Sequence, residues 1–276
     1  MAISMRKARD YVFTNGALWE RALYSYLFDD GPLNRLHQCL LCYKNPDGGW
    51  GHGLEHDLKT PDSNPLALEY LLAVIREFNL PIGNLFDDTA SWLEKQRKDD
   101  GSLKNPASIH DYPIAPWWTE WGGQTAPDSI VGNLTKLELV TPSLAESTQK
   151  WVRANQTLEK IAANEWLFMA YHAFDYFMNV DDFPNVAAYR AATTRNIVEL
   201  AQKLPEKQYH SLFKFASDPK SDIAKALPDE VIQQALDHLA ATQREDGGWA
   251  DQHDLPQWQP MTTISALYAL KNYERL

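Results

Sequence analysis

The chain has 276 residues, of which 37 are acidic and 26 are basic, and its formal net charge is −11. A hydrophobic fraction of 44% with 12% aromatic residues is enough to bury a core, which argues against a disordered chain. The acidic balance argues against a nucleic-acid partner and against an anionic membrane surface, because both recruit clustered lysine and arginine.

Helical periodicity dominates the sequence, and alternating strand patterns are nearly absent. Proline at several first turns, such as Pro65 and Pro142, supports the predicted helix starts. In chain order the predicted helices cover residues 3–13, 16–28, 32–44, 65–78, 85–98, 127–138, 143–155, 161–178, 184–203, 208–216, 228–243 and 262–274. These twelve helices predict an all-α fold in a single domain over residues 1–276.

The N-terminal ten residues are polar and basic, and no apolar segment follows them. The sequence therefore predicts no signal peptide. It contains no run of 18 apolar residues, so it predicts no transmembrane segment. We expect a cytoplasmic protein, and nothing in the sequence indicates its oligomeric state.

An Asp-Gly sequence follows three of the predicted helices. Its three copies are Asp47-Gly48-Gly49-Trp50, Asp100-Gly101-Ser102-Leu103 and Asp246-Gly247-Gly248-Trp249. Their spacing is compatible with six degenerate helix pairs of about 46 residues each, three of which keep the Asp-Gly signature.

The third copy has the pattern Leu-x-x-x-Gln-x-x-Asp-Gly-Gly-Trp over residues 239–249, which resembles the QW repeat of squalene–hopene cyclases. On these residues the chain resembles a small, single-domain, bacterial-type member of the terpenoid cyclase/protein prenyltransferase superfamily. The resemblance implies an (α/α)6 toroid, in which six outer helices surround six inner helices and a central cavity. The signature helices and helix 3–13 would then be outer, together with helices 143–155 and 184–203. The other six, among them 127–138 and 161–178, would be inner. The loops after the signature helices would lie at one end of the toroid.

Those three loops, residues 45–64, 99–126 and 244–261, hold six of the ten tryptophans. They carry twelve acidic and three basic residues, so most of the net charge of the chain lies there. Long loops rich in tryptophan are typical of functional loops rather than disordered ones. We therefore expect an acidic, aromatic site that binds a neutral small-molecule substrate and refuses anionic ligands.

Carboxylates in differing environments can act as general acid and general base, because burial raises a carboxyl pKa whereas a helix N-terminus lowers it. The candidate catalytic residues are Glu120, Asp62, Asp128, Glu55 and Asp57. Aromatic faces and histidines suit substrate binding. The candidate substrate-binding residues are Trp50, His52, His110, Tyr112, Trp117, Trp118, Trp121, Trp249, Trp258 and His172. His172 shares one face of the predicted helix 161–178 with Glu165 and Asp175.

The D-x-D-D acid motif of class II terpene cyclases is absent from the sequence. Three interpretations stay open. The first is a cyclase-like enzyme that uses carboxylate acid/base chemistry, and the second is a glycan-active hydrolase or lyase on the same toroid. The third is a non-catalytic module that binds a cationic ligand or a metal. No cofactor is firmly predicted, and His52 and His56 are the candidate ligands should a divalent metal bind.

Overall fold

The computed structural model describes residues 3–119 and 123–276. This part of the chain contains fourteen α-helices and one two-stranded sheet, so the predicted helical class is confirmed. Contacts between Cα atoms divide the chain into two compact units. One comprises residues 41–196, and the other comprises residues 1–40 and 197–276.

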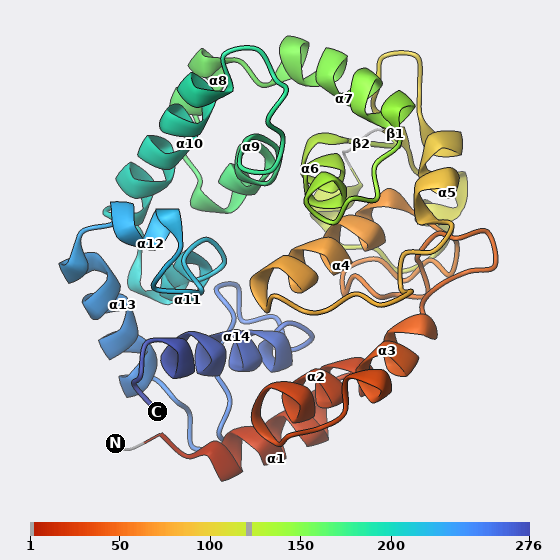
Figure 1. The fold of residues 1–276 in the computed structure, drawn as a ribbon. Helices are drawn as coiled ribbons and strands as arrows, with labels where there is room; N and C mark the ends of the chain where they lie inside the picture. The colour runs from red at the N-terminus through yellow and green to blue at the C-terminus, as the bar shows by residue number, and fades with distance from the viewer. Residues whose placement is uncertain (1–2, 120–122) are drawn as a thin grey trace. The chain divides into compact units, whose positions relative to one another are not determined.

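The 41–196 unit contains seven α-helices, the last of which extends beyond it (Figure 1). They are α4 (Pro65–Glu77), α5 (Thr89–Gln96), α6 (Asp128–Lys136), α7 (Pro142–Asn155), α8 (Leu158–Ala162), α9 (Tyr171–Phe177) and α10 (Val186–Ala201). Three 3-10 helices cover Ala107–Asp111, Pro116–Trp118 and Leu167–Ala170. Strands β1 (Leu103–Lys104) and β2 (Gln124–Thr125) pair antiparallel, with Leu103 opposite Thr125.

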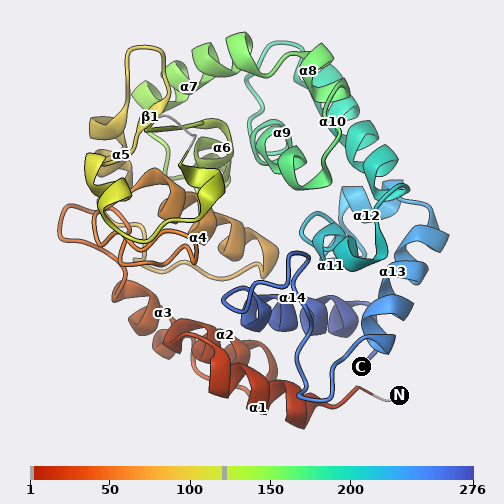
Figure 2. The same ribbon diagram turned by 180° about the vertical axis from the view of Figure 1, so that it is seen from behind.

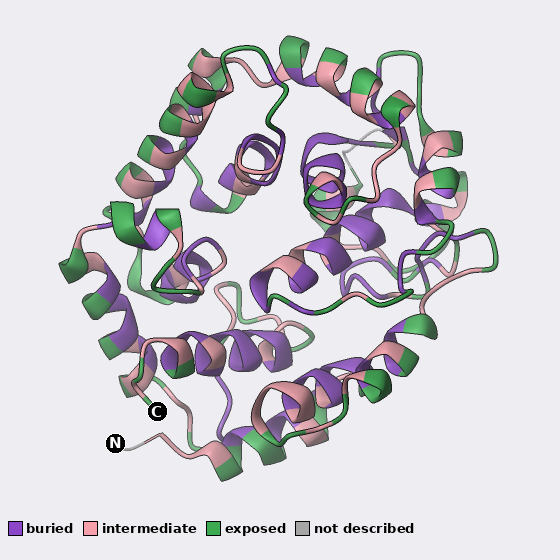
Figure 3. Ribbon diagram, viewed as in Figure 1, coloured by how far each residue is buried: buried purple, intermediate pink, exposed green. Residues whose placement is uncertain are grey.

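Helix α4 forms the interior of this unit. Its first turn is fixed by Pro65 and by the Asn64 side chain, which accepts a hydrogen bond of 2.8 Å from the N–H of Ala67. Ten of its thirteen residues are buried, and Figure 3 shows α4 and α6 as largely buried. Helix α6 packs against both α4 and α9, and Figure 2 shows this arrangement from behind. A helix that is apolar on most of its surface requires neighbours on most sides.

The close approach of α6 to α9 depends on Gly132. A Cβ atom at this position would lie 2.1 Å from the carbonyl oxygen of Asp175. Real side chains do not tolerate such a distance, so only glycine allows the two helices to pack this closely.

The second unit contains α1 (Met5–Asn15), α2 (Leu18–Phe28), α3 (Leu33–Leu41, whose last residue belongs to the other unit), α11 (Tyr209–Leu212), α12 (Asp222–Ala226), α13 (Asp229–Ala241) and α14 (Gln259–Asn272). A 3-10 helix covers Glu206–Gln208. Helix α14 packs against α1, α2, α11 and α13. It is buried along most of its length, and the small hydroxyl side chains of Thr263 and Ser265 are buried there together with apolar ones.

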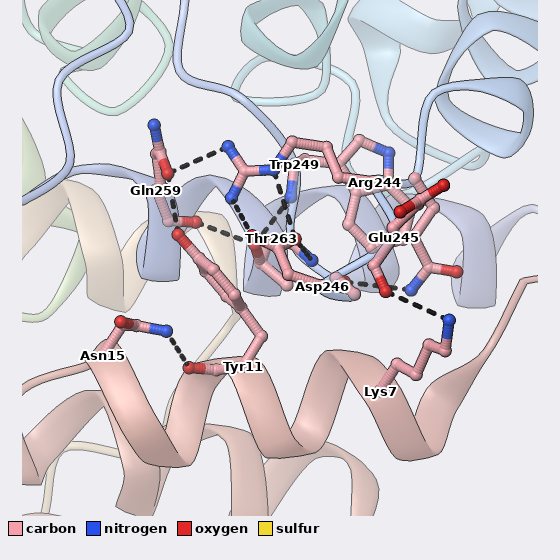
Figure 4. A network of polar contacts seen from close by, with 12 residues as sticks. Lys7, Tyr11, Asn15, Arg244, Glu245, Asp246, Trp249, Gln259 and Thr263 are labelled. Carbon is pink, nitrogen blue, oxygen red and sulfur yellow. Dashed lines mark hydrogen bonds and ion pairs between the residues drawn. The ribbon is translucent and has the colours of Figure 1, made fainter.

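A polar network joins α1 to the start of α14 and to the loop that follows α13 (Figure 4). The Oε1 atom of Gln259 accepts hydrogen bonds from the Tyr11 hydroxyl, at 2.7 Å, and from the Arg244 guanidinium, at 2.9 Å. Arg244 also pairs with Asp246 and lies over the Tyr11 ring. The network ties the signature loop of this unit to two helices that are far apart in the sequence.

The three Asp-Gly sequences fold into turns with the same hydrogen bonds, which we call the aspartate turns (residues 47–49, 100–102 and 246–248). In each, the carboxylate accepts from the N–H two residues later, at 2.9–3.0 Å. In each, the residue two before the aspartate donates to the carbonyl two after it, at 2.8–3.0 Å. The glycine after each aspartate has a φ between 88° and 96°, which side-chain-bearing residues rarely adopt.

Each aspartate turn contacts another helical segment of its own unit through that glycine. A Cβ atom on Gly48 would meet the backbone of Asp88, just before α5, and one on Gly101 would meet the backbone of Ser147 in α7. A Cβ atom on Gly247 would meet the backbone of Lys7 in α1. The sequence signature therefore marks a recurring helix contact as well as a turn.

The predicted helix 161–178 is wrong, because the structure divides this segment. It consists of α8, the 3-10 helix Leu167–Ala170 and α9. The Asn164 side chain accepts from the N–H of Trp166 at 3.2 Å and donates to the Asn196 side chain at 3.0 Å. These bonds compete with the helical backbone and end α8. Glu165 therefore lies outside the helix that carries His172.

Two further differences concern the second unit. The predicted helix 208–216 is only one turn long, as α11, and α12 was not predicted. Both are short segments in which the tertiary contacts outweigh weak local preferences. Among the described residues, no helix has both the length and the apolar character needed to cross a membrane.

Candidate active site

Buried ionisable side chains gather where α4, α6 and α9 meet in the 41–196 unit. Helix α4 contributes Glu69, α6 contributes Asp128, and α9 contributes His172 and Asp175. Arg76 of α4, whose side chain is 10% exposed, lies beside them. Such groups are rarely buried unless they are paired with one another.

Asp128 and His172 form the best-defined pair in the cluster. The Nδ1 atom of His172 lies 2.8 Å from Oδ1 of Asp128, which is fully buried. The Asp128 carboxylate also accepts from the N–H of Ser129, at 2.8 Å, and from Nε2 of Gln156, at 2.7 Å. Burial favours a raised pKa for Asp128, but the charge and hydrogen bond of His172, helped by the other two donors, hold this pKa below its usual range.

His172 is held in its protonated form. Burial acts to lower the pKa of this imidazole, but the charge and hydrogen bond of Asp128, followed by the charges of Glu69 and Asp175, raise it to about 9. The ring also stacks on Tyr171, with the centroids 4.1 Å apart. At neutral pH the pair is therefore an imidazolium beside a carboxylate.

Two more carboxylates complete the cluster. Burial raises the pKa of Glu69 to about 7 against the opposing charge of His172, and the Ser129 hydroxyl donates to the Glu69 carboxylate. Asp175 forms an ion pair of 2.9 Å with Arg76. Burial also raises the pKa of Asp175, while Arg76 opposes the shift. The cluster thus holds several protons whose positions depend on one another.

The imidazole of His172 lines a cavity of about 260 Å³ bounded by α8, α9 and α10. Among the described residues, the ring makes its hydrogen bond through Nδ1, which leaves Nε2 for a group in the cavity. A small organic molecule, or one group of a larger molecule, fits a space of this size. A histidine oriented by a buried aspartate and facing a cavity is equipped to transfer a proton.

Glu55 and Asp57, both predicted as catalytic, lie in a buried loop segment of the same unit. Glu55 accepts from the N–H of Asp57 at 3.0 Å. Burial, followed by the charge of Asp57, raises the pKa of Glu55 to about 8, and the charge of Glu69 contributes in the same direction. This segment packs on the next signature loop, since the N–H of Ala115 donates to the Asp57 carbonyl at 2.9 Å.

The metal candidates do not form a common site. His52 is exposed and its Nε2 bonds to Asn45 at 2.8 Å, whereas His56 is buried and contacts the Tyr70 ring by its edge. Among residues 3–119 and 123–276, no group of three or more His, Cys, Asp or Glu side chains has a metal-binding arrangement.

The remaining predicted residues differ in their surroundings, and Trp118 packs against Leu58 and Leu66. Asp62 is exposed and accepts from the Ser108 hydroxyl. The aromatic and histidine side chains range from buried to exposed. Trp50 and Trp249 are buried, Trp118 and Trp258 are partly buried, and His110, Tyr112 and Trp117 are exposed. Trp249 and Trp258 belong to the second unit, and Glu120 and Trp121 lie outside the described residues.

The structure thus joins Asp128 to His172, and it adds residues that the sequence did not predict as site residues. These are Glu69, Arg76, Gln156 and Asp175. For Glu69 and Arg76 a signal existed, because they are charged residues within an otherwise apolar helix. Gln156 lies beyond the end of α7, and nothing in the local sequence indicates that it contacts Asp128.

No protein-family model matches this chain, and no curated protein matches it at a significant level. The functional argument therefore rests on the residues of the site.

Proposed function

We propose that the chain is an enzyme of the terpenoid-cyclase/prenyltransferase-like toroid class that performs acid/base chemistry through His172 and Asp128. The observation that carries the proposal is the buried Asp128–His172 pair, whose imidazole lines a cavity. Perturbed ionisable groups beside a cavity are typical of active sites.

The aspartate turns support the toroid as the architectural part of this proposal. All three turns follow helices that the resemblance assigns to the outer layer. Their glycines contact the α5 start, α7 and α1, which the resemblance also assigns to the outer layer. A recurring contact from one helix pair to another is expected of a repeat architecture.

The chemistry of the pair favours proton transfer to or from oxygen or nitrogen. An imidazolium with a pKa of about 9 is a weak acid, and an alkene carbon is a very weak base. The absence of the D-x-D-D motif also argues against protonation of an alkene. Within the toroid class, the glycan-active alternative is therefore better supported than a cyclase that protonates an alkene, because glycoside cleavage needs protonation of a leaving oxygen.

The test is turnover of a panel of oligosaccharides and terpenoids, measured by mass spectrometry. For a substrate that the native chain converts, His172→Gln and Asp128→Asn should each lower the rate by about 10²–10⁴-fold, the usual contribution of a general acid or base. His253→Gln is the matched control, because His253 is exposed and belongs to the other unit. Unchanged turnover in His172→Gln would refute the assignment.

The non-catalytic alternative is favoured by one observation, the buried acidic segment with Glu55 and Asp57. It predicts that a cationic ligand raises the melting temperature of the native chain. This stabilisation should be lost in Asp57→Asn and retained in His172→Gln. That pattern, with no turnover across the panel, would replace the enzymatic proposal by a binding module.

A further inference from the structure

The cavity beside His172 has a charge opposite to that of the signature loops. Its charged wall side chains among the described residues are Lys160 and His172, and no carboxylate lines it. The Asp128 carboxylate behind the imidazole balances the charge of His172. Lys160, an exposed side chain, is therefore the cation that the cavity wall adds to the paired His172.

Thr193 gives this cavity a polar group without a described partner. The side chain belongs to α10, is 1% exposed and lines the cavity, and its hydroxyl makes no hydrogen bond to any described residue. Leaving such a group unsatisfied costs about 1–3 kcal/mol. The neighbouring Asn164 and Asn196 differ, because they bond to each other at 3.0 Å. The Thr193 hydroxyl is thus a buried polar group that a ligand reaching it from the cavity would satisfy.

We propose that this cavity binds a single carboxylate group of the substrate, held by the Lys160 ammonium and the Thr193 hydroxyl. A single ammonium group can pair with one carboxylate, whereas it leaves the second charge of a phosphate dianion without a partner. The arrangement leaves Nε2 of His172 free to exchange a proton with an atom beside the carboxylate. The inference rests on the proposed function, whose acid/base pair acts on that atom, and it narrows the substrate class.

This inference differs from the expectation of a site that binds a neutral substrate and excludes anionic ligands. That expectation followed from the loops, whose acidic residues dominate the charge of the chain. The cavity lies between α8, α9 and α10, none of which belongs to a signature loop. A substrate with one carboxylate on an otherwise uncharged body fits this cavity. It also agrees with the expectation of a ligand that is largely uncharged.

The test is an NMR titration of the intact chain with propionate at pH 7.5, with propionamide and inorganic phosphate as comparison ligands. We expect propionate to bind saturably and to shift the signals of Thr193 and His172. Propionamide and phosphate should bind more weakly. Lys160→Met and Thr193→Val should each weaken propionate binding by about fivefold, the effect of a single interaction worth about 1 kcal/mol. Lys150→Met, on the exposed surface of α7, should bind propionate like the native chain.

Thermal unfolding of Thr193→Val separates a binding role from a structural one. Valine has the shape of threonine without the hydroxyl, so removing an unpaired hydroxyl should leave the melting temperature unchanged or higher. A lower melting temperature with unchanged propionate binding would overturn the proposal. Equal affinity for propionate and propionamide, or tighter binding of phosphate, would overturn it as well.

The two proposals fail separately. If propionate does not bind although His172→Gln abolishes turnover, the carboxylate site is wrong and the acid/base pair stands. If propionate binds as described while His172→Gln keeps full turnover, the carboxylate site stands and the proposed function is wrong.

Discussion

Nδ1 of His172, in α9, lies 2.8 Å from Oδ1 of Asp128, at the first residue of α6. The aspartate therefore sits at a helix N-terminus, where the backbone dipole favours its charged form. Its hydrogen bond also fixes the orientation of the imidazole that lines the cavity. This contact links the fold to the proposed chemistry.

The first prediction concerns the pKa of His172. An NMR titration of the imidazole should give a value of about 9 in the native chain, and Asp128→Asn should lower it towards or below the ordinary 6.5, because the largest stabilising charge is lost. The folded pKa lies above the unfolded one. The stabilisation from this group is therefore complete below pH 6.5 and is lost as the pH rises through 9. A value near 6.5 in the native chain would contradict the ion pair.

The second prediction concerns stability at alkaline pH. The pKa of Glu55 is raised from 4.5 to about 8, so the folded state holds a proton that the unfolded state releases, and stability falls as the pH rises between these values. Glu55→Gln should remove this loss and increase the free energy of unfolding by about 1–3 kcal/mol at pH 8. At pH 4 it should have little effect. Urea unfolding at both pH values measures the difference.

The exposed residue Glu146 provides the control for that experiment. Glu146→Gln removes the same charge from the surface of α7 and should leave the dependence of stability on pH unchanged. If both variants behave alike, the effect belongs to the net charge of the chain and not to burial of Glu55.

The third prediction concerns the contact between α6 and α9. Gly132→Ala would place a Cβ atom against the Asp175 backbone, so the helices must move apart, and overpacking of this kind costs about 1–3 kcal/mol. Gly123→Ala is the comparison, because its Cβ atom would meet nothing within 4 Å and only its φ of 72° is unfavourable. Thermal unfolding should show the larger loss for Gly132→Ala, together with a lowered His172 pKa. An unchanged pKa would mean that the helix spacing does not control the pair.

The fourth prediction uses two adjacent aspartates. Asp100 accepts from the N–H of Ser102, at 2.9 Å, and from its hydroxyl, at 2.6 Å, whereas the exposed side chain of its neighbour Asp99 has no hydrogen bond to a described residue. Asp100→Ala should lower the free energy of unfolding by about 1–2 kcal/mol, the contribution of two hydrogen bonds. Asp99→Ala should change it by less than about 0.5 kcal/mol. Similar losses in both variants would show that the turn does not stabilise the fold.

The sequence predicted the long helices well, and the reasons are local. Helix α4 begins at Pro65 behind the Asn64 cap, and both signals are visible in the sequence. The break between α8 and α9 was not predictable, because Asn164 is held by Asn196, thirty-two residues away. Local periodicity contains no information about a partner at that distance.

The candidate site was predicted only in part, because local sequence patterns do not show which distant residues come into contact. Asp128 was expected at a helix start and His172 on a helical face, and each expectation needed only nearby residues. Their pairing, and the contribution of Gln156, depend on how three helices pack. The charge of the loops was evident from the sequence, but the cavity that brings Lys160 and His172 together is a property of the fold.

The aspartate turns have a consequence for the addition of helix pairs by duplication. Each turn presents one surface and each contacted helix presents the matching one, so a duplicated helix pair would carry both halves of its own interface. An array with such head-to-tail complementarity has an unsatisfied surface at each end, which invites association with other copies. Here Gly247 of the turn at 246–248 contacts α1, so the first helix of the chain covers the last signature. The contact surface of this last turn is therefore covered within its own unit, where a second copy of the chain cannot use it.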